Sequence, residues 1–190
     1  MGSDPPSPSS SRLSDGPWAL SDEYVETVFE GLGVTVEGRN RVYEDAALRE
    51  RIAAAGGPDR VWRFFFVSRL SISPSPGFGM ASVARPHVVK ESKAAFGDEL
   101  RDRGFVGVET DETTTVRVAD HRATLTPHRA RLPLAGDAVS VVGALAVWHD
   151  DDFIVAGGAY PEAGLERWVE GGVDADAYED ELLSLIRAVA

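Results

Sequence analysis

The stretch VSVVGALAVWHDDDFIVAGGAY, residues 139–160, decides the fold. Two apolar runs flank a polar tip, His149 to Asp152. In the run before the tip, both alternating sets of side chains are apolar, and the run from Phe153 to Tyr160 has the same character. Strands with apolar residues at both alternating positions are usually covered on both faces. The stretch therefore predicts a hairpin of two central strands with helices above and below.

Further strands are predicted on the N-terminal side of this hairpin. The segment RVWRFFFVSRLSIS, residues 60–73, is β-branched and aromatic with a continuous apolar centre, which is typical of a central strand. From Phe105 onward the apolar residues repeat every second position. The predicted strands of this region, joined by short turns into an antiparallel meander, are 105–109, 113–119, 122–132, 138–148 and 153–160.

Helical spacing of apolar residues predicts four helices. The first begins at Ser21, with Leu20 as a hydrophobic staple, and ends before Gly33. The others span about 44–55, run from a first turn at Pro86 to about Arg103, and begin at a cap on Asp174 or Asp176. A short strand, 34–37, and a turn, 38–40, separate the first two helices.

Together these elements predict an α+β domain. Its sheet is mostly antiparallel, has about six to seven strands, and carries helices on both faces. Residues 1–16 are rich in proline and serine and are predicted to be a disordered tail, with residues 17–190 as a single domain. The tail has neither the basic start nor the apolar centre of a signal peptide. The longest apolar run, Val139 to Trp148, is shorter than the roughly 20 residues of a membrane helix, so a cytoplasmic location is expected.

The composition is strongly acidic. The 190 residues include 31 Asp and Glu against 19 Lys and Arg, for a net charge of −12. Only Lys90 and Lys93 are lysines. A surface rich in carboxylates and poor in lysine is suited to concentrated salt, although GC-rich coding DNA also produces this bias. The charge argues against general binding to nucleic acid or to a membrane surface.

The usual catalytic and metal-binding patterns are missing. Cysteine is absent, which excludes disulfides, thiolate metal sites and a cysteine nucleophile. His149 to Asp152 lacks the ligand spacing of a calcium loop, and the four histidines have no zinc-type spacing. The segment GFGMAS, residues 77–82, lacks the end of a phosphate-binding loop, and no GxSxG elbow occurs. No catalytic residue, metal or cofactor is therefore assigned.

One segment of the chain is locally basic. Between Thr113 and Ala135 there is a single acid, Asp120. The same segment contains four arginines, Arg117, Arg122, Arg129 and Arg131. Guanidinium groups bind carboxylates and phosphates well, so this strip is a candidate docking site for an anion or an acidic partner. The alternative is a set of solvated sheet edges whose arginines pair with acids elsewhere.

Glycines interrupt the central hairpin at Gly143 and at Gly157-Gly158. If His149 to Asp152 form the loop, Gly143 faces Gly158 in the paired strands. Glycines inside strands usually mark the close approach of another group. We expect a helix to pack there, most simply the last one; a bulge or the floor of a small ligand pocket at Gly143 and Gly158 are the alternatives.

The segment DDDFIVAGGAYPE, residues 150–162, follows a long apolar strand and precedes a closing helix. In this arrangement it resembles uncharacterised domain families of haloarchaea, and the order of elements is similar to that of PsbP-type α/β/α sandwiches. Some of those haloarchaeal relatives resemble lipoproteins with an anchoring cysteine, which this chain lacks. The resemblance implies a fold and a salt-adapted setting, and it identifies no site residue.

The sequence therefore favours a non-catalytic binding or accessory domain of a salt-adapted cytoplasm, with an unknown protein or an anion as its partner. One alternative is an enzyme whose site is assembled from scattered residues, which would require a pocket with convergent polar groups. A second is an anion- or nucleic-acid-associated module that uses the arginine strip, which would require aromatic residues beside the arginines.

Overall fold

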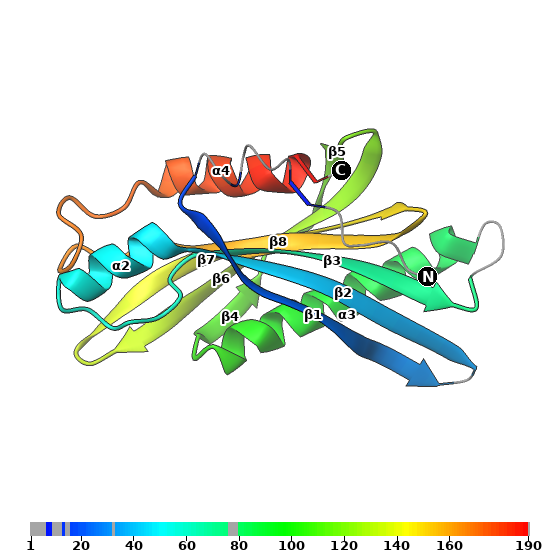
Figure 1. Ribbon diagram of the computed structural model, residues 1–190, viewed down its shortest axis with the longest axis horizontal. Helices are drawn as coiled ribbons and strands as arrows, with labels where there is room; N and C mark the ends of the chain where they lie inside the picture. The colour runs from blue at the N-terminus through cyan, green and yellow to red at the C-terminus, as the bar shows by residue number, and fades with distance from the viewer. Residues whose placement is uncertain (1–6, 9–12, 14–15, 32, 76–79, 190) are drawn as a thin grey trace.

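The computed structural model describes residues 7, 8, 13, 16–31, 33–75 and 80–189. It has one antiparallel sheet with helices on both faces, so the predicted α+β class is confirmed (Figure 1). The strands are β1 (Trp18–Gly31), β2 (Val34–Asp45), β3 (Phe64–Ser73), β4 (Val106–Thr110), β5 (Thr114–Val118), β6 (His121–Leu134), β7 (Asp137–Asp150) and β8 (Asp152–Ala163). The helices are α2 (Ala46–Ala54), α3 (Met80–Asp102) and α4 (Ala175–Arg187).

The strand order is β1-β2-β3-β8-β7-β6-β4, and β5 also pairs with β6. The predicted hairpin, β7 with β8, lies in the middle of the sheet. Side chains at odd and at even positions of this hairpin pack into two separate hydrophobic cores, one on each face of the sheet. Leu145 and Val147 pack with α2 and α3 on one face, whereas Ala146 and Trp148 pack with α4 on the other. The apolar residues at both parities of this hairpin are thus explained by helices on both sides.

The helix predicted from Ser21 is wrong, because this segment is the edge strand β1. Its pairing with β2 shifts register twice, between Leu20 and Asp22 and between Thr27 and Phe29. The apolar residues also lie on both faces of the strand, as Tyr24 and Val25 show, so the two-residue repeat that identifies a strand is absent and the spacing matches a helix. The segment predicted to be the first helix is therefore an additional strand, and the sheet has eight strands.

The turn predicted at residues 38–40 is also wrong, because this segment lies inside β2. Gly38 is a site of close packing within the strand. A Cβ at Gly38 would lie 3.0 Å from Val28 Cγ2 and 3.5 Å from Leu70 Cδ2. Side chains of β1 and β3 thus lie close to the space that a side chain at position 38 would fill.

Three smaller predictions need correction. The loop of the central hairpin is shorter than His149–Asp152, because pairing extends to Asp150 and Asp152 and only Asp151, with φ of 55°, forms the turn. The register therefore moves by one residue, and Gly158 faces Ala144 rather than Gly143. Pro86 lies inside α3 rather than in its first turn.

The glycines of the hairpin are covered by helices on opposite faces. A Cβ at Gly158 would lie 3.0 Å from Leu182 Cδ1 of α4, and a Cβ at Gly143 would lie 3.3 Å from the Phe96 ring of α3. The predicted packing of the last helix is confirmed at Gly158. The hairpin also has a bulge, but it lies between Ser140 and Val141 and not at the glycines.

The described part of the N-terminal segment lies against the domain. Ser7 Oγ is 3.0 Å from the Tyr43 hydroxyl, and Pro8 forms an isolated bridge with Val189. Leu13 packs against the core on the α4 side. The rest of the segment predicted to be disordered lies outside the described residues.

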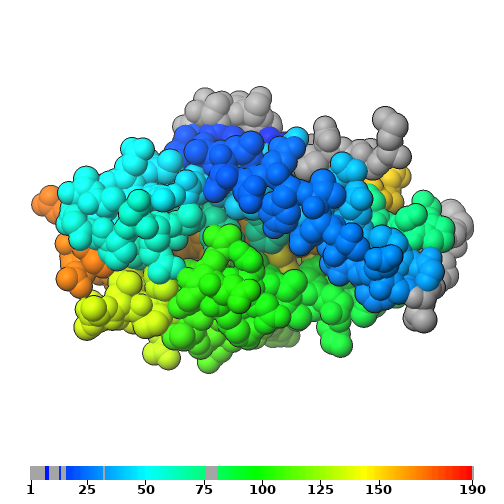
Figure 2. Space-filling view, turned by 60° about the horizontal axis from the view of Figure 1, so that its bottom comes forward, coloured from blue at the N-terminus to red at the C-terminus, as the bar shows by residue number. Residues whose placement is uncertain are grey.

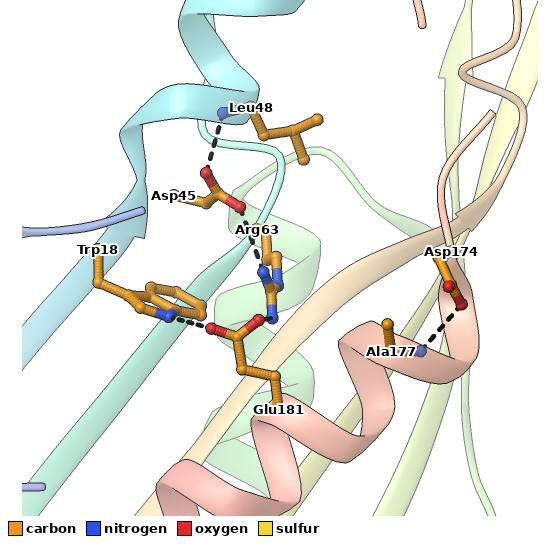
Figure 3. Close-up of polar contacts among 7 residues, drawn as sticks. All are labelled: Trp18, Asp45, Leu48, Arg63, Asp174, Ala177 and Glu181. Carbon is orange, nitrogen blue, oxygen red and sulfur yellow. Dashed lines mark hydrogen bonds and ion pairs between the residues drawn. The ribbon is translucent and has the colours of Figure 1, made fainter. Parts of the chain in front are cut away.

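A buried arginine connects the start of the sheet to α4 (Figure 3). The side chain of Arg63 is 2% exposed. Its Cζ lies 4.6 Å from the centre of the Trp18 ring and 4.0 Å from that of Tyr178. Its Nη1 is 3.2 Å from Asp45 Oδ2, and its Nη2 donates to Glu181 Oε2 at 2.7 Å. Two carboxylates and two aromatic rings thus surround one guanidinium.

Both carboxylates of this network make a second contact. Asp45 Oδ1 accepts the Leu48 amide at 2.9 Å and so caps the N-terminus of α2. Glu181 Oε1 accepts the Trp18 indole N–H at 2.8 Å. The network therefore joins the start of β1, the junction of β2 and α2, the residue before β3, and α4.

We predict that Gly158→Ala destabilises the fold by roughly 1–3 kcal/mol, because the added methyl meets the Phe64 carbonyl oxygen and Leu182. Urea unfolding measures the effect. Gly97→Ala in α3 is the matched control, because the nearest atom is the mobile guanidinium of Arg101 at 3.3 Å. A Gly158→Ala protein as stable as the parent would show that the sheet relaxes around the methyl.

We predict that Arg63→Met costs about 3–5 kcal/mol, because it leaves Asp45 buried without its charged partner. Arg101→Met, which breaks an exposed pair with Asp98, should cost less than about 1 kcal/mol. The two variants are compared by urea unfolding at one fixed salt concentration. Equal stabilities would mean that the buried pair contributes no more than a surface pair.

Candidate functional site

The four arginines predicted to form a strip lie on β5 and β6 and are all exposed. Arg117 and Arg122 are directly paired across the two strands, so their side chains share one face of the sheet. Arg129 and Arg131 have the opposite parity on β6 and share the other face. The structure therefore does not bring the four guanidinium groups together on one surface.

The two arginine pairs differ in their surroundings. Arg129 Nη2 forms an ion pair with Asp111 Oδ2 at 3.0 Å. On the other face, Arg85 of α3 donates to the Arg122 carbonyl oxygen and joins Arg117 and Arg122. Among the described residues, no ion pair links these three arginines to a carboxylate. Anion binding at this group stays a prediction.

The histidines are dispersed. His87 lies on the exposed side of α3, 3.9 Å from Glu91, and His121 Nε2 is 3.7 Å from Asp150. His128 is 1% exposed and packs edge-on against Phe96, and burial lowers its pKa. Within the part of the chain that the structure describes, no group of three metal-ligating side chains occurs.

The alternative of a ligand-pocket floor concerns the central hairpin, whose tip is acidic. Gly143 and Gly158 lie beneath Phe96 and Leu182, so a helix side chain occupies the space above each glycine. In the acidic tip, Asp152 accepts a hydrogen bond from Ser71 at 3.1 Å. In the segment 77–82, residues 77–79 lie outside the described residues, and residues 80–82 begin α3.

The surface that sequence reasoning missed is β1. Seven large apolar side chains are exposed among the described residues, and five of them lie on this strand. They are Leu20, Tyr24, Val25, Val28 and Phe29, each between 41% and 55% exposed. The signal was present in the sequence, but the helix prediction assigned these side chains to a buried face. We call these five residues the β1 surface.

Part of the β1 surface faces α3. Figure 2, which turns that side toward the viewer, shows the surface hollowed between α3 and the blue strands β1 and β2. Burial raises the pKa of the Tyr24 hydroxyl, and the carboxylates of Glu26 and of Glu99 on α3 raise it further. Val28 Cγ2 would lie 3.0 Å from a Cβ at Gly38.

The backbone of β1 forms one edge of the sheet. Among the described strands it pairs with β2 only, and between its two bulges the register is regular over six residues, Asp22 to Thr27. Within this stretch Glu23 is bound by Arg41 Nε at 2.9 Å, and Glu26 accepts the Asn40 side-chain amide at 3.0 Å. The arrangement combines a regular free edge, apolar side chains on both faces, and acidic groups.

No helix among the described residues is long and apolar enough to cross a membrane. Comparison with curated proteins finds no match. A family model described as "Domain of unknown function (DUF6517)" matches residues 5–190, which include every helix and strand of the sheet domain. The prediction that the chain belongs to an uncharacterised domain family is confirmed. The chain belongs to the DUF6517 family.

Proposed function

We propose that this domain is a non-catalytic binding domain that docks a protein partner on the β1 surface. The observation that carries the proposal is the concentration of exposed apolar side chains on one edge strand. Contiguous apolar patches on soluble proteins commonly mark interaction sites. Long exposed edge strands are otherwise avoided, because they invite unwanted pairing.

Two groups with displaced pKa values, His128 and Tyr160, lie where no substrate reaches them. Catalytic groups need displaced pKa values at places that a substrate can reach. Here burial lowers the pKa of His128 and raises that of Tyr160, but both side chains are inside the packed core, at 1% and 4% exposure. Their pKa displacements therefore support a structural role for both groups.

The docking role is tested with the double variant Val25→Ser/Phe29→Ser, which removes apolar area from both faces of β1. Tagged protein is incubated with an extract of its source cells in concentrated KCl, and the co-purifying proteins are identified by mass spectrometry. We expect this variant to lose the specific partner that the parent retains. Val83→Ser/Val106→Ser removes side chains of α3 and β4 that are at least as exposed as Phe29, and it should retain the partner. Retention by both variants would contradict the docking role of β1.

We further propose a salt-rich cytoplasm as the setting of this binding domain. The 31 carboxylates and the scarcity of lysine support this setting. At low ionic strength the acidic groups repel one another across the surface, and salt shortens the range of this repulsion to about 3 Å at 1 M.

The melting temperature should therefore rise steeply over the first roughly 0.5 M of added KCl, where screening changes most, and more slowly above it. Thermal unfolding followed by circular dichroism measures this dependence. A flat or falling melting temperature over the same range would remove the argument for salt adaptation, and it would leave the docking proposal intact.

A further inference from the structure

We propose that the partner binds as an added β-strand, and that the segment it contributes is extended, apolar and basic. This inference rests on the proposed function and specifies the mode and the chemistry of the contact. The binding stretch is Asp22 to Thr27, where β1 pairs regularly with β2. A partner strand along these six residues would extend the sheet on the side of β1 that no described strand occupies.

The backbone geometry supports strand addition at this stretch. A strand at the end of a sheet has a row of N–H and C=O groups directed away from its neighbour, and these groups can bind a further strand. The bulges at either end of Asp22–Thr27 disturb this row, whereas between them the pairing is uninterrupted. The partner therefore contributes a short strand of about six residues.

The side chains of an added strand would meet apolar groups on both faces of the sheet. Tyr24 and Val25 have opposite parity in the regular stretch, so they lie on opposite faces. On the α3 side, alternate residues of the partner would lie beside Tyr24. On the α4 side, the other residues would lie beside Val25. An apolar residue of the partner strand thus gains an apolar contact whichever face of the sheet it lies on.

The charge of β1 specifies a basic partner. The strand contains Asp22, Glu23, Glu26 and Glu30 and no basic residue. Glu23 already pairs with Arg41 of β2, whereas no ion pair of the other three acids is found among the described residues. Opposite charges on neighbouring strands stabilise a sheet, and like charges placed directly opposite one another destabilise it. If a second copy of the chain paired antiparallel over all six residues, Glu23 would lie opposite Glu26 twice. The acidic strand therefore favours a basic segment of another protein over a second copy.

The test uses a labelled peptide of about ten residues that alternates valine and arginine, long enough to cover the regular stretch. Fluorescence anisotropy measures its binding to the full chain. Two further peptides carry N-methyl groups, one on every valine and the other on every residue. The N–H groups of alternate residues point to opposite edges of a strand, so the fully methylated peptide cannot pair normally through either edge and should bind roughly tenfold or more weakly. The peptide methylated on valine alone can pair through its other edge and should retain most of its affinity.

Three controls complete the experiment. A peptide that alternates valine and glutamate should bind much more weakly than the arginine peptide, and this difference should shrink as KCl is added. Binding of the arginine peptide should be lost in Val25→Ser/Phe29→Ser and retained in Val83→Ser/Val106→Ser. Sedimentation analysis of the free chain should show a monomer.

Four results would overturn the inference. They are equal binding of all three arginine peptides, equal binding of the glutamate peptide, no measurable binding of any peptide, and a dimer that the Val25→Ser/Phe29→Ser variant dissociates. If any of these occurs while that variant still loses its cellular partner, strand addition fails and the proposed docking function stands. If the variant keeps its cellular partner, the proposed function itself fails.

Discussion

The buried guanidinium of Arg63 is the constraint on which the arrangement of this fold depends. A charge that is 2% exposed must be paired, and its two partners come from the end of β2 and from α4. Trp18, at the start of β1, stacks on the same group and binds Glu181. The geometry of one side chain thus determines where the first strand begins, how α2 starts, and where the last helix lies against the sheet.

Most of the fold could be predicted from the sequence, because the central strands and α4 have local patterns that agree with their final environments. The hairpin of β7 and β8 and the cap on Asp174 are examples. Prediction failed at β1, where the apolar residues lie on both faces of the strand. It also failed at Gly38. The sequence Gly38-Arg39-Asn40 is typical of a turn, and nothing in it shows that the glycine leaves room for Val28 and Leu70. Both failures concern contacts between distant segments.

The candidate site was less predictable than the fold. The arginine strip was defined by nearness in sequence, but a strand directs successive residues to opposite faces, so Arg122 and Arg129 separate. Arg85, which lies on α3, donates to the carbonyl oxygen of Arg122, and no local sequence pattern indicates this contact. The β1 surface was hidden by the wrong assignment of secondary structure: apolar residues on a helix suggest burial, whereas the same residues on an edge strand remain exposed.

The two bulges of β1 also have a consequence for solubility. An edge strand that accepts another strand is a hazard, because each added chain offers a new edge and growth can continue into a fibre. In β1 the regular ladder is limited to Asp22–Thr27, and each end is distorted. A long partner strand cannot continue past either bulge without losing hydrogen bonds. The two bulges thus limit the length of strand that can pair with β1, and this limit disfavours open-ended polymerisation.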